Sequence, residues 1–297
     1  MSHTATITTA PETLKTGRDV RLAARANTCT TTSGLAPGYL QTNLIVLPSR
    51  YATDFRLLCA RNPVPCPLVA ESRAPGSWGS FKSCVDGVNG AEMLCDVDIR
   101  RDAPRFNIYK DGILVKKDCE NITPEWTDDH VAFLIGCSFS FESALTCAGL
   151  LPRHTLLGRN VPMYRTTLPL CPAGVFTGGT FVVSMRSYPA SKIDKVREIT
   201  RAYASTHGEP IAWGWDSLKK LGIENVDAPN WGDAPLCLDG RPLSELKGST
   251  EDVPVFWGCG VTPQEAVMRA GLEGVVMAHS PGHMVLLDIE DSDVITR

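Results

Sequence analysis

Two histidines near the C-terminus flank a short turn. The segment HSPGH, residues 279–283, lies between two apolar runs, so we expect strand, turn and strand. Histidine is the side chain whose ordinary pKa lies nearest neutrality, which makes His279 and His283 candidates for a general acid and a general base. The H-x-x-x-H spacing binds zinc when both rings share a helix face, but the intervening Pro-Gly pair excludes that helix, and no metal site is predicted.

A second candidate is the stretch FLIGCSFSFESAL, residues 133–145. An apolar strand feeds a small-residue turn, and a helical pattern opens at Ser140. The free N–H groups and the dipole of a helix start favour an anion such as a carboxylate. Ser138 and Ser140 add hydroxyls there, and Glu142 adds a titratable group. The alternative is that Ser140 is an N-cap and Glu142 an ordinary first-turn acid.

Arginines follow in two places. The stretch LGRNVPMYRTTLP, residues 157–169, carries Arg159, Tyr164 and Arg165, and Arg186 ends the apolar run FVVSM. Guanidinium groups can grip a planar carboxylate through two hydrogen bonds, so these residues are candidate substrate ligands. The alternative is that the arginines hold neighbouring backbone or pair with surface acids.

Two amides and one cysteine complete the candidates. Gln41 and Asn43 lie two positions apart on a predicted strand and therefore share a face, where they bind a ligand or satisfy loop backbone. Cys259 lies between two glycines before a helix start, for which Thr262 is the predicted N-cap and Glu265 its capping-box partner. A cysteine near a helix N-terminus can have a lowered pKa and act as a nucleophile.

Strands and helices alternate along the chain, which predicts a mixed α/β (α+β) fold with mixed sheets and interleaved helices. We expect residues 1–30 to form an N-terminal tail and helix. Residues 31–297 form a single unit, with two subdomains that meet near residues 150–190 around one central pocket. The predicted helices are 12–25, 50–60 and 191–205, the predicted strands include 43–47, 92–99 and 253–257, and residues 72–90 form a surface loop.

Composition limits the functional class. The 297 residues are 43% hydrophobic and 21% charged, which is typical of a globular protein, and the net charge of −4 argues against a nucleic-acid surface. No apolar run is long enough to span a membrane, and residues 1–10 lack the features of a signal or transit peptide and are expected to be a disordered tail. The eleven cysteines are odd in number and include no C-x-x-C pair, which favours a reduced, cytoplasmic protein without a disulfide framework.

Nine segments of the chain resemble a family of bacterial hydro-lyases, each named "putative hydro-lyase", that shares its domain with D-glutamate cyclase. They run in family order from about residue 34 to residue 288: GLAPGYLQTNLIVLP, ARNPVPCPL, DIRRDAPRFNIYKDG, VAFLIGCSFSFESAL, RNVPMYRTTLP, FVVSMR, HGEPI, VPVFWGCGVTPQ and AHSPGHM.

The resemblance implies a hydro-lyase that acts on an amino acid without a cofactor. D-glutamate cyclase closes the α-amine of glutamate onto the γ-carboxylate, which releases water and gives 5-oxo-D-proline. The sequence contains neither the dinucleotide-binding nor the P-loop glycine motif. The expected partner is a small amino-acid or dicarboxylate substrate, and whether the chain forms a homo-oligomer is left open.

The resemblance also suggests how the candidate residues divide the chemistry. A carboxylate needs a clamp, the ammonium must lose a proton, and the departing oxygen must gain protons. The clamp is assigned to Arg159, Arg165 and Arg186, the acid and base to His279, His283 and Glu142, and the stabilising donors to Ser138, Ser140, Tyr164 and the N–H groups after Gly136 and Gly260.

The chain departs from the family after its HGEPI segment. The family commonly continues with a histidine, where this sequence has Ala212, followed by Trp213 and a second indole at Trp215. Trp213 would suit a larger or more apolar ligand. Two alternatives therefore stand beside the cyclase: a divergent member with a larger amino-acid-derived substrate, and a non-catalytic carboxylate-binding or amino-acid-binding protein. A hydrolase that uses Cys259 as its nucleophile is the third.

Overall fold

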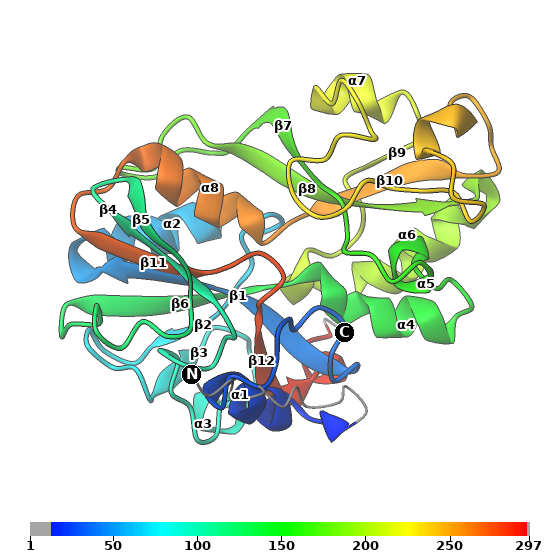
Figure 1. Ribbon diagram of the computed structural model, residues 1–297. Helices are drawn as coiled ribbons and strands as arrows, with labels where there is room; N and C mark the ends of the chain where they lie inside the picture. The colour runs from blue at the N-terminus through cyan, green and yellow to red at the C-terminus, as the bar shows by residue number, and fades with distance from the viewer. Residues whose placement is uncertain (1–12, 296–297) are drawn as a thin grey trace, which may run out of the picture.

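Strand β1 (Tyr39–Pro48) is the centre of the larger of two sheets in the computed structural model, which describes residues 13–295 (Figure 1). On one side β1 pairs with β6 (His130–Gly136). On the other it pairs with β12 (Val285–Glu290) along its first half and with β11 (Val275–His279) along its second. The remaining strands are β2 (Leu68–Ser72), β3 (Phe81–Ser83), β4 (Phe106–Lys110) and β5 (Ile113–Cys119), in the order β3-β2-β6-β1-β11-β4-β5. The pairs are antiparallel.

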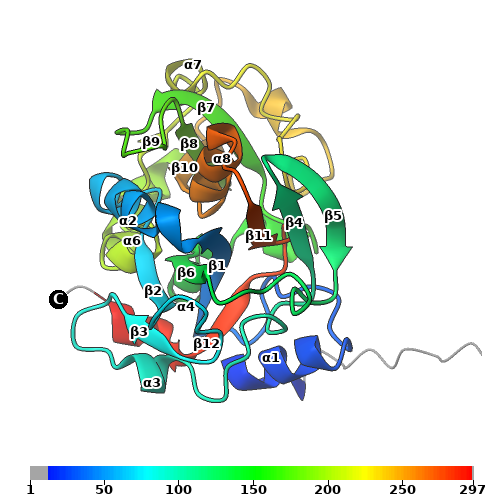
Figure 2. The same ribbon diagram turned by 90° about the vertical axis from the view of Figure 1, so that its left-hand side faces the viewer.

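Both faces of this sheet are covered, which explains why its central strands contain continuous apolar runs. In β1, Leu44 and Val46 enter one hydrophobic cluster and Ile45 and Leu47 enter the other. Figure 2 shows α2 (Ala52–Arg61) and α8 (Val261–Ala270) on one side of the sheet, and α1 (Gly17–Arg25) and α3 (Gly90–Met93) on the other.

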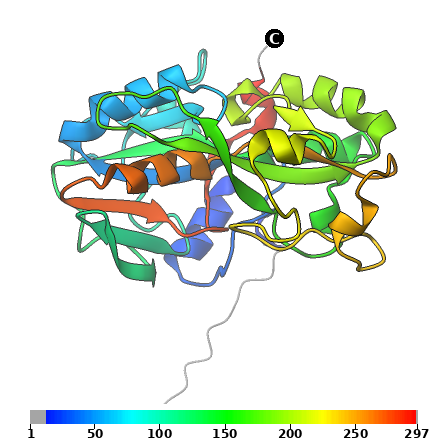
Figure 3. The same cartoon turned by 90° about the horizontal axis from the view of Figure 1, so that it is seen from above.

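The smaller sheet has the order β7-β8-β10-β9. Its strands are β7 (Met163–Pro169), β8 (Thr180–Tyr188), β9 (Ala212–Trp213) and β10 (Val253–Gly258). Clusters on its two faces include residues of α4 (Glu142–Cys147) and α6 (Ile193–Arg201) on one side and of α7 (Ser217–Leu221) on the other. Viewed from above, the helices around the small sheet lie beside the large sheet (Figure 3).

Short helices connect these elements. They are α5 (Arg153–Leu156) and the 3₁₀ turns η2 (Ser49–Tyr51), η3 (Ser138–Phe141), η4 (Ala190–Lys192), η5 (Ala204–Thr206), η6 (Leu243–Leu246) and η7 (Asp291–Val294). The chain enters the small sheet after β6 and returns to the large one after β10.

The mixed α/β class is therefore confirmed, while the boundary near residues 150–190 stays a prediction. Among residues 13–295, no helix combines the length and the apolar character that crossing a bilayer requires.

Several predicted elements are wrong in detail. Residues 92–99 are not a strand: the segment starts inside α3 and then runs irregularly, because Val97 and Ile99 enter the core without strand pairing. The predicted loop 72–90 contains β3, which pairs with β2.

Two helix starts also differ from their predictions. Helix α1 begins at Gly17, where Thr16 and Asp19 form a capping box, while residues 1–12 of the predicted tail and helix lie outside the described residues. Helix α8 begins at Val261, and the Thr262 hydroxyl binds the backbone of Val182 instead of capping it. This bond holds α8 against β8, so a tertiary contact replaces the predicted capping box.

Candidate functional site

Arg186 is the buried cation on which the site is built. It lies on β8 opposite Val255 of β10, and its side chain is fully buried. The guanidinium carbon lies 5.0 Å from the ring centroid of Phe141 and 5.4 Å from that of Trp257. Aromatic faces stabilise a cation where water is excluded, so these two rings and the strand fix the position of the positive charge.

The carboxylate of Glu142 forms an ion pair with Arg186. The Nε of Arg186 donates to Oε1 of Glu142 at 2.8 Å, and a second guanidinium nitrogen binds the same oxygen. The remaining hydrogen bonds of Arg186 go to the hydroxyls of Ser184 at 2.9 Å and Ser138 at 3.1 Å. Burial acts to raise the pKa of Glu142, but the charge of Arg186, followed by that of His154, brings it below its ordinary value. Glu142 is therefore ionised at neutral pH.

His154 lies on the other side of the same carboxylate. Its Nε2 is 3.3 Å from Oε2 of Glu142, and its ring meets Phe139 edge to face with the centroids 6.0 Å apart. The imidazole comes from α5 and the carboxylate from α4. Glu142 thus joins a buried arginine to a histidine, and an imidazole held by a carboxylate can hold and transfer a proton.

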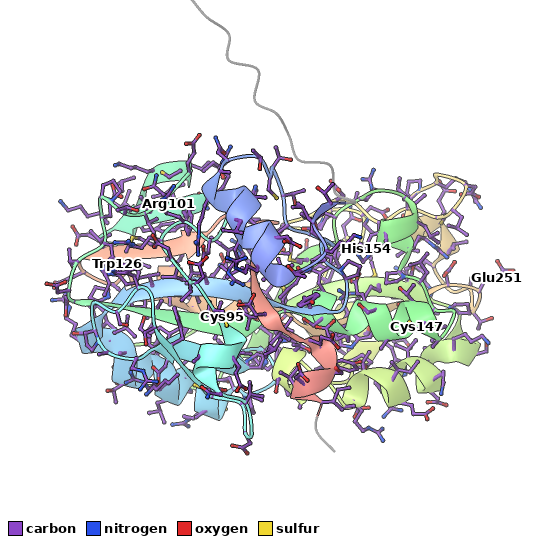
Figure 4. All side chains as sticks on the ribbon, turned by 90° about the horizontal axis from the view of Figure 1, so that it is seen from below. Cys95, Arg101, Trp126, Cys147, His154 and Glu251 are labelled. Carbon is purple, nitrogen blue, oxygen red and sulfur yellow. The ribbon has the colours of Figure 1, made fainter. Side chains whose placement is uncertain are left out.

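A pocket of about 820 Å³ opens beside this cluster. Figure 4 shows Cys147 of α4 and His154 of α5 on the same half of the molecule. The pocket lies where the loop before β1 and the end of β12 approach α4, α5 and the loop after α5. Its polar lining residues include Thr31, Ser33, Gln41, Glu142, Ser143, His154, Arg159, Asn160, Asp233 and Asp291.

Three lining residues carry buried polar atoms that have no hydrogen-bond partner among the described residues. They are Oε1 of Gln41, Nε of Arg159 and both carboxylate oxygens of Asp291. Buried polar atoms are nearly always paired, so unpaired atoms that gather at one pocket indicate a place for a ligand. These unpaired atoms include hydrogen-bond donors and acceptors. A zwitterionic ligand needs both, because it carries a carboxylate and an ammonium group.

The pocket collects some of the predicted residues. Gln41, Glu142 and Arg159 line it, and Arg186 and Ser138 lie behind Glu142. Ser140 does not cap α4; its hydroxyl accepts a hydrogen bond from the backbone N–H of Gln41 at 3.1 Å. The predicted N-cap is therefore wrong, because a contact with β1 uses that hydroxyl.

The two predicted histidines lie outside the lining of this pocket. Nε2 of His279 is 3.0 Å from Oδ1 of Asn43 and its Nδ1 is 2.8 Å from the Ser280 carbonyl oxygen, while burial lowers its pKa to about 4. The ring of His283 lies between the carbonyl oxygens of Pro281 and Thr30, at 2.8 and 2.9 Å. Both rings therefore hold a turn in place, and their catalytic roles stay predictions.

Three further candidates lie elsewhere in the fold. The Tyr164 hydroxyl donates to the carbonyl of Val226 in the core of the small sheet. Arg165 is half exposed and pairs with Glu265 at 2.6 Å. Trp213 is also partly exposed and lies 4.5 Å from the guanidinium carbon of an arginine on α6. The described lining of the pocket includes none of the three.

Cys259 and the two turn glycines are explained by packing. Burial raises the pKa of the Cys259 thiol to about 12, which leaves little thiolate for nucleophilic attack at neutral pH. A Cβ on Gly136 would lie 1.9 Å from the carbonyl oxygen of Ser205, and one on Gly260 would lie 1.9 Å from the amide nitrogen of Asn43. Close contacts therefore require glycine at both positions. Among residues 13–295, no group of three or more His, Cys, Asp or Glu side chains could hold a metal ion.

The sequence predicts neither His154 nor Asp291 as a site residue. Asn160 belongs to the donor-rich stretch 157–169 but is not among the predicted substrate ligands. His154 lies in a short polar stretch without a motif, and Asp291 lies in the acidic run DIEDSD, which is typical of a solvated chain end. Only the buried position of Asp291 distinguishes it from its acidic neighbours.

Comparison with known proteins gives a consistent result over most of the chain. The profile of the D-glutamate cyclase family matches residues 131–288. A protein of Schizosaccharomyces pombe named "Putative hydro-lyase" is 45% identical over 258 residues, which cover 87% of this chain and 79% of that protein. Proteins with the same name are 43% identical in Jannaschia, over 88% of this chain and 89% of that protein, and 39% identical in Azorhizobium caulinodans, over 99% of each.

Proposed function

The chain belongs to the D-glutamate cyclase family of hydro-lyases, and on that premise we propose that it converts an acidic amino acid, most like D-glutamate, into its cyclic lactam and water without a cofactor. The observation that carries this proposal is the pocket whose buried donors and acceptors lack partners. A molecule with both a carboxylate and an ammonium group would satisfy atoms of both kinds.

Arg159 is the proposed carboxylate ligand. It lines the pocket, its Nε has no hydrogen-bond partner in the described part of the chain, and Asn160 beside it lines the pocket as well. A guanidinium can bind a carboxylate and stabilise the negative charge that develops on its oxygens during attack. Arg186 takes a different role, since it is fully buried and bound to Glu142, and it holds the carboxylate that orients His154.

The reaction needs two protons to leave the nitrogen and two to reach the departing oxygen. The ammonium first loses a proton, and the amine then forms a C–N bond with the γ-carboxyl carbon. The C–O bond breaks as the oxygen accepts protons and leaves as water, and the nitrogen loses its second proton. His154, beside Glu142, is placed to deliver a proton to the leaving oxygen. Holding the amine against the carboxyl carbon can itself lower the barrier by several kcal/mol, up to about 10.

The alternative of a larger substrate is based on Ala212 and Trp213. Both lie on β9, at the edge of the small sheet, and the described lining of the pocket does not include them. The pocket therefore supplies no observation in favour of that alternative. The binding-protein alternative makes a distinct prediction: acidic amino acids would raise the melting temperature without being consumed.

The proposal is tested by incubating the purified chain with D- and L-glutamate and D- and L-aspartate, without added nucleotide. We expect loss of primary amine and appearance of 5-oxoproline by NMR with D-glutamate. The paired variants Arg159→Ala and Arg165→Ala separate the pocket from the surface, because only the first residue lines the cavity. Arg159→Ala should lower kcat/KM by about 100-fold or more, the cost of about 3 kcal/mol of charged hydrogen bonding, and Arg165→Ala should change it less than about threefold. Absence of lactam from every acidic amino acid would refute the proposal.

A further inference from the structure

We infer that Asp291 binds the ammonium group of the substrate and accepts its first proton, which restricts the substrates to amino acids with a free amine. This inference rests on the proposed function and assigns a role that the family profile does not reach, since the matched segment ends at residue 288.

The position of Asp291 is fixed by the backbone. It is the first residue of η7, directly after β12, and its N–H donates to the carbonyl oxygen of Gly38 at 2.8 Å. Gly38 belongs to the loop before β1, which lines the pocket together with Asp291. The side chain is 5% exposed, and neither carboxylate oxygen has a hydrogen-bond partner in residues 13–295. A buried carboxylate in this state is costly unless a ligand pairs with it.

The groups around Asp291 do not neutralise it. The Ser140 hydroxyl of η3 and the Tyr203 phenol after α6 face it, and Glu290 precedes it on its own segment. Glu142 of α4 lines the same pocket but is bound to Arg186. None of the ion pairs found in the described chain includes Asp291. No cation among residues 13–295 pairs with this carboxylate, so an ammonium group of a ligand would supply a counter-charge that these residues do not.

A second buried aspartate shows what a structural role looks like. Asp102 is fully buried, but Nε of Arg25 lies 2.5 Å from one of its oxygens and Nε of Arg21 lies 3.6 Å from the other. The Asp98 backbone N–H also donates to it at 2.9 Å. Asp102 ties α1 to the loop before β4, and it is fully paired. Asp291 is nearly as buried but has no such cationic partner, and it lies at the wall of a cavity.

The pKa of Asp291 is suitable for a general base. Burial is the main cause that raises the pKa of its carboxyl to about 7, with the Ser140 hydroxyl acting to lower it and Glu290 to raise it. A base whose pKa lies near the working pH exchanges protons readily. Binding of an ammonium favours the carboxylate form, so substrate binding at pH 6.5 should release protons to the buffer.

The test uses two ligands that differ only in the amine. D-2-amino-4-sulfobutanoate resembles D-glutamate but carries a sulfonate in place of the γ-carboxylate, so it cannot form the carboxamide ring, and 4-sulfobutanoate lacks the amine. Calorimetry in buffers of different ionisation enthalpy measures affinity and proton release for wild type, Asp291→Asn and the control Glu290→Gln, whose side chain is the exposed neighbour.

We expect Asp291→Asn to bind the amino ligand at least about 30-fold more weakly and without proton release, while its affinity for 4-sulfobutanoate stays within about twofold. Glu290→Gln should keep its affinity for both ligands within about twofold and should still release a proton on binding the amino ligand, because Glu290 lies outside the described lining of the pocket and its charge only raises the pKa of Asp291. In wild type alone, affinity for the amino ligand should fall by about tenfold per pH unit below pH 7, and affinity for 4-sulfobutanoate should not. This last measurement does not depend on the folding of a variant.

Two outcomes separate the two proposals. If wild type makes 5-oxoproline but Asp291→Asn keeps its affinity for the amino ligand, or if wild type releases no proton on binding it, the role of Asp291 is overturned and the cyclase proposal stands. If wild type neither makes the lactam nor binds either ligand, the proposed function itself fails.

Discussion

Two regions of the molecule place a histidine near other polar groups. They differ in whether the polar atoms there have hydrogen-bond partners. In the first, His154, Glu142 and Arg186 stand beside a large pocket, and buried polar atoms at that pocket have no partner among the described residues. In the second, the turn from His279 to His283, each ring nitrogen lies within 3.0 Å of an oxygen acceptor.

The difference teaches that residue type is a weak guide to a site. His279 and His283 have the more suggestive spacing in the sequence, but their rings secure a turn through hydrogen bonds within it and to Asn43 and Thr30. His154 has no motif, but it faces a cavity and a charged partner. Unsatisfied polar atoms at a cavity are the physical sign of a binding site, because a protein rarely leaves such atoms unpaired when folding alone decides their place.

The largest expected effect comes from breaking the ion pair at the first region. Arg186→Met would leave the Glu142 carboxylate buried without its cation, and loss of one partner of a buried pair costs roughly 3–5 kcal/mol. Urea unfolding at pH 7.5 measures this change in the free energy of unfolding. The control Arg165→Met removes an exposed pair, for which we expect less than about 1 kcal/mol. Equal losses would show that Arg186 is not the electrostatic centre of the fold.

The comparison is sharpened by exchanging one histidine from each region. His154→Gln should lower kcat for lactam formation by about 100-fold, the usual contribution of a positioned acid, with little change in melting temperature. His279→Gln should change kcat by less than about threefold, because its ring lies outside the described lining of the pocket. The opposite pattern in steady-state kinetics would make the turn the catalytic element.

The smallest effect separates the two regions by the sign of their pH dependence. Asp291 has a folded-state pKa of about 7, above the unfolded value near 4, so its burial costs stability increasingly as pH rises from about 4 to 7. His279 has a folded-state pKa of about 4, below the unfolded value near 6.5, so its burial costs stability increasingly as pH falls from about 6.5 to 4.

Melting curves between pH 4.5 and 8 test this contrast. The difference in melting temperature between Asp291→Asn and wild type should grow by a few degrees toward pH 8, and that between His279→Gln and wild type should grow toward pH 4.5. Each variant is compared with wild type at the same pH, so other titrating groups, including the buried His207, cancel. Parallel slopes for the two variants would contradict the assignment of opposite charge states to these sites.

Part of the site could be predicted from the sequence. A carboxylate at a helix start, a guanidinium and a strand amide suit a polar ligand, which predicts Glu142, Arg159 and Gln41, and all three line the pocket. The same reasoning predicts Tyr164 and Arg165, which lie elsewhere, because the alternation of side chains along β7 and the contacts with neighbouring elements decide where each side chain lies.

The sequence by itself determined the family and the strands at the centre of the core, because the motifs are local and β1 and β6 contain the continuous apolar runs 44–48 and 131–135. Only the tertiary structure decided which polar groups meet. Gln41, His154 and Asp291 are distant along the chain, and their approach depends on how β12 pairs with the first half of β1 and on where α5 packs. Whether a buried atom stays unpaired depends on every neighbour that the fold brings to it, and local sequence does not contain that information.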